Sequence, residues 1–333
     1  MRSRSIRAPL RVAGLASLLC SWTVVHAQPS TDQILTEMGF SAAEQRRVLD
    51  GEFVTTKLVG VSERDLAYAV AFLVKSSPET LSEQVLDGTR VADDAQARAY
   101  GALNGPGALK DFSALRITND EARALSMVEP GDAMNFSAGD YVSFKALRGQ
   151  STQTVEEQLR RTLLTRYQSY RTSGLAGIAP YVRERGGVAD VASDLRRAVQ
   201  SMVAVQNHLP ELYTVLLDYP RTPAPAIRQS FRWVKLIIRE KPTYLLDHIL
   251  VASDGGARAV VRRTFYVSTG YNAEQSVAGL LPVAGGTVIL YMTHAFTDQV
   301  AGSGGSVKRS IGSRLMADRM KEIFETARKR IDR

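Results

Sequence analysis

Two histidines and one arginine are the residues whose types and positions in this 333-residue chain could do chemistry. His248 and His294 each alternate with apolar residues in a run typical of a β-strand, so both should point toward a core or a cavity. Such an imidazole can be a neutral, hydrogen-bonded core residue, a ligand contact, or a general base or metal ligand. These interpretations stay open. The sequence assigns no catalytic residue.

Arg263 alternates with Val261, Phe265 and Val267 in the run between the two histidines. A buried guanidinium is costly without a partner. We therefore expect Arg263 to pair with a carboxylate such as Asp247, to reach solvent, or to meet an anionic ligand.

A glycine-rich loop at residues 302–306 leads into a helix that carries Lys308 and Arg309. Backbone amides at a helix start, together with two cations, could hold a phosphate or a lipid headgroup. The alternative is a plain connection between a strand and a helix.

Polar residues gather at the ends of the predicted hairpins and could form the rim of a pocket or simply cap the turns: Tyr266, Tyr271, Asn272, Gln275, Thr297, Asp298 and Gln299. The sequence contains no Gly-x-Ser-x-Gly or His-Glu-x-x-His motif. A metal site would need both histidines and an acid such as Asp298 to converge, and no spacing indicates this. We predict no cofactor and no metal.

The elements that must position these residues are strands and one long helix. Alternating runs predict strands at 231–239, 243–252, 258–267, 275–281 and 287–296, with turns at 241–242 and 254–256. A helix is predicted at 307–331, with Ile311, Leu315 and Phe324 among its buried residues. The predicted class is α+β: an antiparallel meander that grips the C-terminal helix, with a helical insertion in the middle.

The earlier part of the chain predicts a strand near 52–60, a second at 66–75, and a helix that begins at Ser77-Pro78. Helices are predicted at 154–170 and 190–207, and a proline-rich connector at 220–225 follows. We divide the chain into a signal peptide (1–27), the N-terminal part of the α+β domain (28–149), the helical insertion (150–220), and the sheet with its C-terminal helix (221–333).

The first 27 residues carry four arginines, no acid and an apolar core, which is typical of a secretory signal peptide. Cleavage after Ala27 would give a periplasmic or secreted protein and would remove Cys20, the only cysteine. Residues 307–333 carry nine Lys or Arg against four acids, a formal charge of +5, so the rest of the chain after the first 27 residues is near neutral. This basic helix favours an anionic membrane surface, or solvent alone, over nucleic acid.

The stretch AVAFLVKSSPETLSEQVLD at 69–87, with the later meander and helix, resembles the helix-grip fold of START-like and polyketide-cyclase-like domains. The stretches FYVSTGYN, GLLPVAGGTVILY, TDQVAG and SVKRSIG are similar to a group of exported proteobacterial proteins of no known activity. The first resemblance implies a cavity between the sheet and the helix.

We therefore expect a non-catalytic protein that binds a hydrophobic or amphipathic molecule, such as a lipid, between the meander and the C-terminal helix. The alternatives are an interaction module of the cell envelope, and a helix-grip enzyme that uses His248 or His294. The predicted ligand contacts are Tyr244, His248, Arg263, Phe265, Tyr291, His294, Ser303, Gly304, Gly305 and Lys308.

Overall fold

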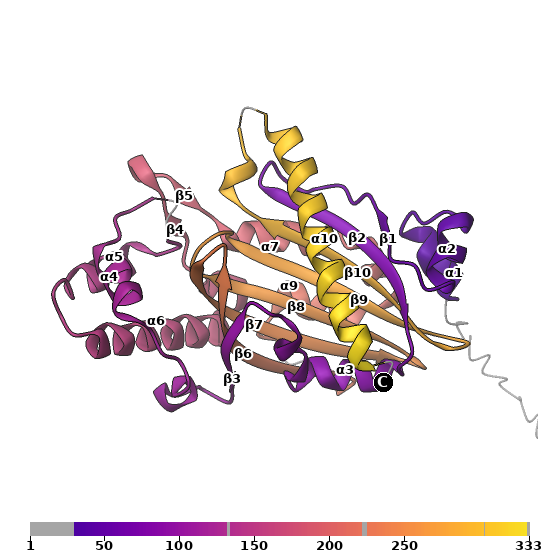
Figure 1. Cartoon of the computed structure of the whole chain (residues 1–333), viewed down its shortest axis with the longest axis horizontal. Coiled ribbons are helices and arrows are strands. Elements are labelled where there is room, and N and C mark those ends of the chain that lie inside the picture. Colours follow the sequence, from indigo (N-terminus) through magenta and orange to yellow (C-terminus); the bar gives the residue numbers. More distant parts are fainter. Residues whose placement is uncertain (1–29, 132–133, 222–224, 303, 332–333) are drawn as a thin grey trace, which may run out of the picture.

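One antiparallel sheet organises the chain. A computed structural model of the protein describes residues 30–131, 134–221, 225–302 and 304–331. Within these ranges eight strands form a sheet in the order β1-β2-β10-β9-β8-β7-β6-β3 (Figure 1). The predicted signal peptide and Ser303 lie outside the described residues.

The five predicted C-terminal strands are confirmed and form a continuous meander. They are β6 (Ile227–Ile238), β7 (Lys241–Asp254), β8 (Ala257–Val267), β9 (Ala273–Val283) and β10 (Gly286–Phe296). The turn between β6 and β7 lies at Arg239 and Glu240, which have φ values of 48° and 64°. The turn predicted at 241–242 is therefore wrong, because Lys241 and Pro242 already belong to β7.

Three more strands complete the sheet: β1 (Val54–Thr56), β2 (Asp65–Val74) and β3 (Ala97–Leu103). β2 pairs with β10 along its whole length, so the first long strand lies beside the last one. β3, which the sequence does not predict, pairs with β6 at the opposite edge. Its exposed and partly buried residues alternate, so its apolar signal is weak.

The helices are α1 (Thr31–Glu37), α2 (Ala42–Leu49), α3 (Pro78–Leu86), α4 (Asn119–Met127), α5 (Ala138–Lys145), α6 (Thr152–Ser173), α7 (Val191–Gln200), α8 (Val203–His208), α9 (Pro210–Asp218) and α10 (Gly305–Ile331). Short 3₁₀ turns include η1 (Thr89–Asp93) and η2 (Leu109–Phe112). Ser77 caps α3 as predicted, because its hydroxyl accepts the Thr80 N–H. The helix predicted at 190–207 is two helices, α7 and α8, which meet at Ser201 and Met202.

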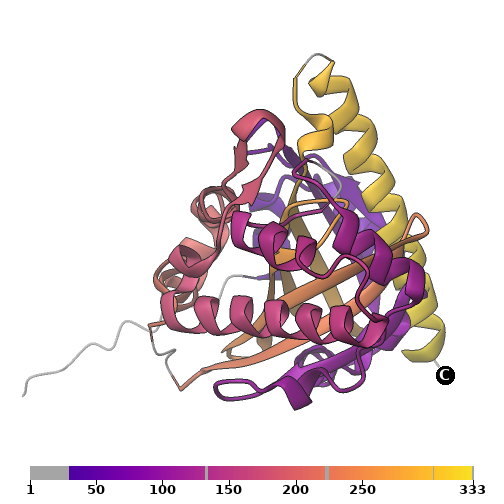
Figure 2. The ribbon, with the colours of Figure 1, turned by 90° about the vertical axis from the view of Figure 1, so that its left-hand side faces the viewer.

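Both faces of the sheet are covered. Helices α7, α8 and α9 pack on one face through Val199, Leu212 and Leu216, against Leu250 and Val261 of the sheet. α6 continues this helical layer beside the end of the sheet that includes β6 and β7. Figure 2 shows the middle helices on one side of the strands and α10 on the other. This arrangement explains why β7 is buried along nearly its whole length.

The long helix α10 crosses the second face and packs mainly against β2. Its Phe324 lies against Phe72 of β2, with ring centroids 3.6 Å apart, and Phe53 stacks on Phe72 at 5.4 Å. The predicted burial of Phe324 is therefore confirmed. The predicted burial of Ile311 and Leu315 is wrong, because both side chains are 56% exposed. Among the described residues, no helix is long and apolar enough to cross a membrane.

Candidate functional site

Four polar side chains lie next to one another across the middle of the sheet, on the face that the middle helices cover. Strand pairing puts His248 opposite Arg263, Arg263 opposite Gln275, and Gln275 opposite His294. Each is at most 1% exposed. We call these four residues the polar row. Buried polar groups need hydrogen-bond partners, so the partners decide what each member of the row can do.

His248 is a buried, neutral member of the row. Its Nδ1 lies 3.0 Å from the hydroxyl of Tyr170 in α6, and its Nε2 lies 2.9 Å from Oε1 of Gln229. An amide oxygen only accepts, so Nε2 carries the proton and Nδ1 accepts from the tyrosine. Burial, together with the charges of Arg263 and Arg171, lowers the pKa of His248 well below 6.5. His248 therefore serves the packing of the core.

Arg263 is fully buried among neutral partners. Its guanidinium donates to Gln275 Oε1 at 2.9 Å, to the Tyr170 hydroxyl at 3.2 Å and to the Leu216 carbonyl at 2.7 Å. Leu216 lies in the last turn of α9, where the helix dipole is negative and favours a cation. The expected partner Asp247 lies on the other face, because neighbouring residues of a strand point to opposite sides. There it accepts a hydrogen bond from Thr264 at 2.6 Å.

His294 has different partners from His248. Its Nδ1 lies 2.7 Å from Oδ2 of Asp65, and its Nε2 lies 3.3 Å from the hydroxyl oxygen of Ser201. The carboxylate accepts a hydrogen bond from Nδ1–H, so Nε2 carries no proton and is the acceptor that faces the serine. Asp65 is 2% exposed and also accepts the Val61 N–H at 2.7 Å. This is the arrangement of nucleophile, base and orienting acid found in serine hydrolases.

Local structure explains why these three residues meet. Asp65 is the first residue of β2 and pairs with Phe296, two residues beyond His294 on β10, so it lies diagonal to the histidine on the same face. Ser201 caps the C-terminus of α7 and is exposed to solvent. We call Asp65, His294 and Ser201 the Ser201 site. His294 belongs both to this site and to the polar row, and Ser201 is the member of the site that is exposed to solvent.

The chain on either side of Ser201 carries charged and apolar residues. Arg197 lies one turn earlier on α7, with its side chain 40% exposed, and it forms an ion pair with Asp194. Arg64 also pairs with Asp194 at 3.2 Å. Burial raises the pKa of Asp194, and both arginines oppose that shift. Val203, two residues after Ser201, is 57% exposed. Arg197 also donates to the Ser193 hydroxyl at 3.0 Å, so its guanidinium is held toward the N-terminal side of α7, away from Ser201.

The other face of the sheet holds a separate group of charges. Arg262 pairs with Glu274 at 2.5 Å, and the hydroxyl of Tyr291 donates to Glu274 at 3.2 Å. Burial raises the pKa of Tyr291 to about 12, so this phenol stays protonated. Tyr291 was a predicted ligand contact, and the structure places it on the opposite face from the polar row.

The remaining predicted contacts do not converge on one place. Tyr244 donates to Glu121 at 3.4 Å, and Phe265 stacks on Tyr170 at 4.1 Å, both on the face of the middle helices. Gly304, Gly305 and Lys308 lie at the start of α10. The predicted cavity between the meander and α10 therefore does not unite these residues, because the side of β7 and β8 that carries Tyr244 and Phe265 faces the middle helices.

Two hollows stand out among the described residues, and both lie away from the Ser201 site. A hollow of about 460 Å³ lies between α3 and η1 and includes Gln84 and Arg90. A smaller one of about 100 Å³ includes Arg166, Phe265 and Tyr266. Within the described ranges, no group of three His, Cys, Asp or Glu side chains is arranged to hold a metal.

Two of the polar residues expected at a pocket rim, Asn272 and Asp298, hold a hairpin to the sheet. Arg183, which follows the two-residue strand β4 (Tyr181–Val182), pairs with Asp298 at 2.8 Å and donates to Asn272 Oδ1 at 3.0 Å. Asn272 in turn donates to Asp298 at 3.1 Å. These contacts fix the loops around the end of β10.

The sequence pointed to His294 but not to Asp65 or Ser201. No motif marks either partner, because 229 residues separate Asp65 from His294 and 93 separate Ser201 from it. Comparison of the chain with known proteins gave no matching family model, no matching curated protein and no matching solved structure. The geometry of the site therefore carries the functional argument alone.

Proposed function

We propose that the protein is a serine-dependent acyl-transfer enzyme, an esterase or a related hydrolase. The observation that supports this proposal is the hydrogen-bonded series Asp65–His294–Ser201, in which the acid and base are buried and the serine is exposed. Catalytic groups of this kind are recognised by geometry and roles rather than by their order in the chain. The enzyme alternative that rests on His294 is thus favoured over the one that rests on His248.

The reaction would begin with attack of the Ser201 oxygen on the carbonyl carbon of an ester. The serine proton passes to Nε2 of His294, and Asp65 stabilises the resulting imidazolium through its bond to Nδ1. His294 then gives the proton to the departing alcohol. Water hydrolyses the acyl-serine in a second step that uses the same base.

Ser201 must reorient before it reacts, because its hydroxyl also lies 2.8 Å from the Ala198 carbonyl. The hydroxyl proton has two acceptors at rest, and the bond to His294 at 3.3 Å is the longer one. Such bonds often tighten only when a substrate is bound.

The test is labelling and turnover with simple probes. A fluorophosphonate reagent should label Ser201, as mapped by peptide mass spectrometry, and p-nitrophenyl acetate and butyrate should be hydrolysed. Ser201→Ala should lower the hydrolysis rate by at least about 10³-fold. Ser113→Ala is a matched control, since Ser113 is also an exposed serine that caps a helix C-terminus.

Three results would refute the proposal: absence of labelling, labelling at another residue, or unchanged turnover in Ser201→Ala. Because Ser201 is exposed, the substitution should leave folding intact, and circular dichroism checks this. Binding of a lipid or another amphiphile stays a prediction. No contact in the described residues favours it over acyl transfer, since α10 and β2 meet through Phe72 and Phe324.

A further inference from the structure

The N-terminal half of α10 exposes a line of apolar side chains. Val307, Ile311 and Leu315 are 62, 56 and 56% exposed. They are four residues apart, so they lie one above another along one side of the helix. The opposite side of this half packs on the body of the protein. An added Cβ on Gly312, for example, would lie 2.8 Å from Leu66.

Cations flank this apolar line. At 3.6 residues per turn, Lys308 lies on one side of it and Arg314 on the other, and both are exposed. Arg309 points to the body, where it donates to the Glu63 carbonyl at 3.0 Å. No acidic residue occurs from Gly305 to Ala317, and Asp318 is the first acid of the helix. The exposed side of this half is therefore both apolar and positively charged.

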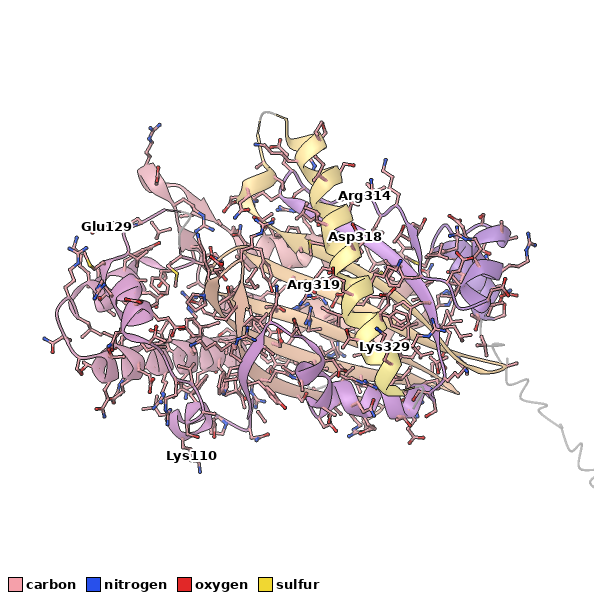
Figure 3. All side chains as sticks on the ribbon, in the orientation of Figure 1. Lys110, Glu129, Arg314, Asp318, Arg319 and Lys329 are labelled. Atoms are coloured by element: carbon pink, nitrogen blue, oxygen red, sulfur yellow. The ribbon has the colours of Figure 1, made fainter. Side chains whose placement is uncertain are left out.

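This surface stands at the edge of the molecule. Figures 1 and 2 both show the N-terminal end of α10 at the outer limit of the structure. Figure 3 shows Arg314 in this upper half, and Lys329 at the other end of the same helix. A flat partner can therefore approach the half-helix without meeting the middle helices.

We propose that residues 305–317 of α10 dock on an anionic lipid surface. An apolar line bordered by cations is what a helix presents when it lies in a membrane interface. Val307, Ile311 and Leu315 would enter the boundary between headgroups and acyl chains, and Lys308 and Arg314 would meet the phosphates. A second copy of this chain fits less well, because two such faces would bring like charges together. The proposal is independent of the chemistry at Ser201.

The test is co-sedimentation with vesicles of phosphatidylcholine alone and of phosphatidylcholine with phosphatidylglycerol. The double variant Ile311→Ser/Leu315→Ser should lower partitioning into the anionic vesicles by more than about tenfold. The variant Lys308→Ala/Arg314→Ala should lower this partitioning by about fivefold for each charge removed. Added salt should lower the partitioning of the unchanged protein. All forms are compared in the same full chain, so residues 1–27 contribute equally.

Two controls match these changes at other places. Val142→Ser removes a valine that is 71% exposed on α5, and Lys110→Ala removes an exposed lysine far from α10 (Figure 3). Neither should change partitioning. The proposal is overturned if the protein does not bind the anionic vesicles or if it binds both vesicle types equally. It is overturned as well if the control substitutions lower partitioning as much as the α10 substitutions do. It is also overturned if sedimentation velocity shows a dimer that Ile311→Ser/Leu315→Ser dissociates.

Discussion

The buried, neutral His248 should make the stability of the protein depend on pH in a way that one substitution removes. In the folded protein burial holds the pKa of His248 well below 6.5, whereas in the unfolded chain it returns to about that value. Below pH 6.5 the unfolded state therefore binds a proton that the folded state does not. This linkage stabilises the unfolded state, so the free energy of unfolding falls as the pH falls.

The size of the effect follows from one titrating group. Between about pH 7.5 and pH 5.5, His248 should remove about 1.4 kcal/mol from the free energy of unfolding. Carboxylates add their own pH dependence, but they do so equally in a variant that lacks the imidazole. The difference in the free energy of unfolding between the unchanged protein and His248→Gln should therefore change by this amount between the two pH values.

Urea denaturation at both pH values measures the effect. His248→Gln should be less stable than the unchanged protein near neutral pH, because the packing with Tyr170 is disturbed, and it should lose less stability on acidification. Gln229→Met is the control, since it removes a hydrogen-bond partner at the same place and keeps the imidazole. If acidification lowers the free energy of unfolding equally in the unchanged protein and in His248→Gln, the assignment of a buried, neutral histidine is refuted.

Three further changes test other parts of the structure. Asp65→Asn removes the acceptor of the imidazole proton and should lower the turnover of p-nitrophenyl esters by about 10²- to 10⁴-fold, with unfolding curves as the check on stability. Gly174→Ala should destabilise the fold by more than about 3 kcal/mol, because Gly174 has φ +57° and a new Cβ would lie 1.7 Å from the Tyr219 carbonyl oxygen. Gly149→Ala, at φ +79° with open space around it, should cost far less in the same urea titration. Phe324→Ala should cost about 3–5 kcal/mol and speed hydrogen exchange in α10, and unchanged exchange would contradict the docking described for this helix.

Much of the secondary structure could be predicted from local pattern. The alternating runs of the meander predicted the ends of the strands to within a few residues, because each strand is buried and its apolar residues recur at every second position. The pair Ser77-Pro78 fixed the start of α3. Prediction was worse where the pattern was weak, as in β3, or where the chain bends without a proline or glycine, as at Ser201 between α7 and α8.

The sequence also predicted that His248, Arg263 and His294 point inward, and the structure confirms it. It did not show which layer covers them. Both faces of the sheet are apolar, and strand alternation alone cannot say whether a given side meets α10 or the middle helices. For the same reason a repeat of apolar residues in α10 did not reveal that the side chains of Ile311 and Leu315 face solvent and not the sheet.

The sequence by itself therefore determined every strand of the eight-stranded sheet except β3, the helices α3, α6 and α10, the α+β class and the inward direction of His248, Arg263 and His294, since these depend on neighbours a few residues apart. Only the tertiary structure decided which polar groups meet. The pairing of β2 with β10 brings Asp65 to His294, and the packing of α7 on the sheet brings Ser201 to the same imidazole. Contacts across such distances in the chain depend on how whole elements pack, and no local pattern encodes them.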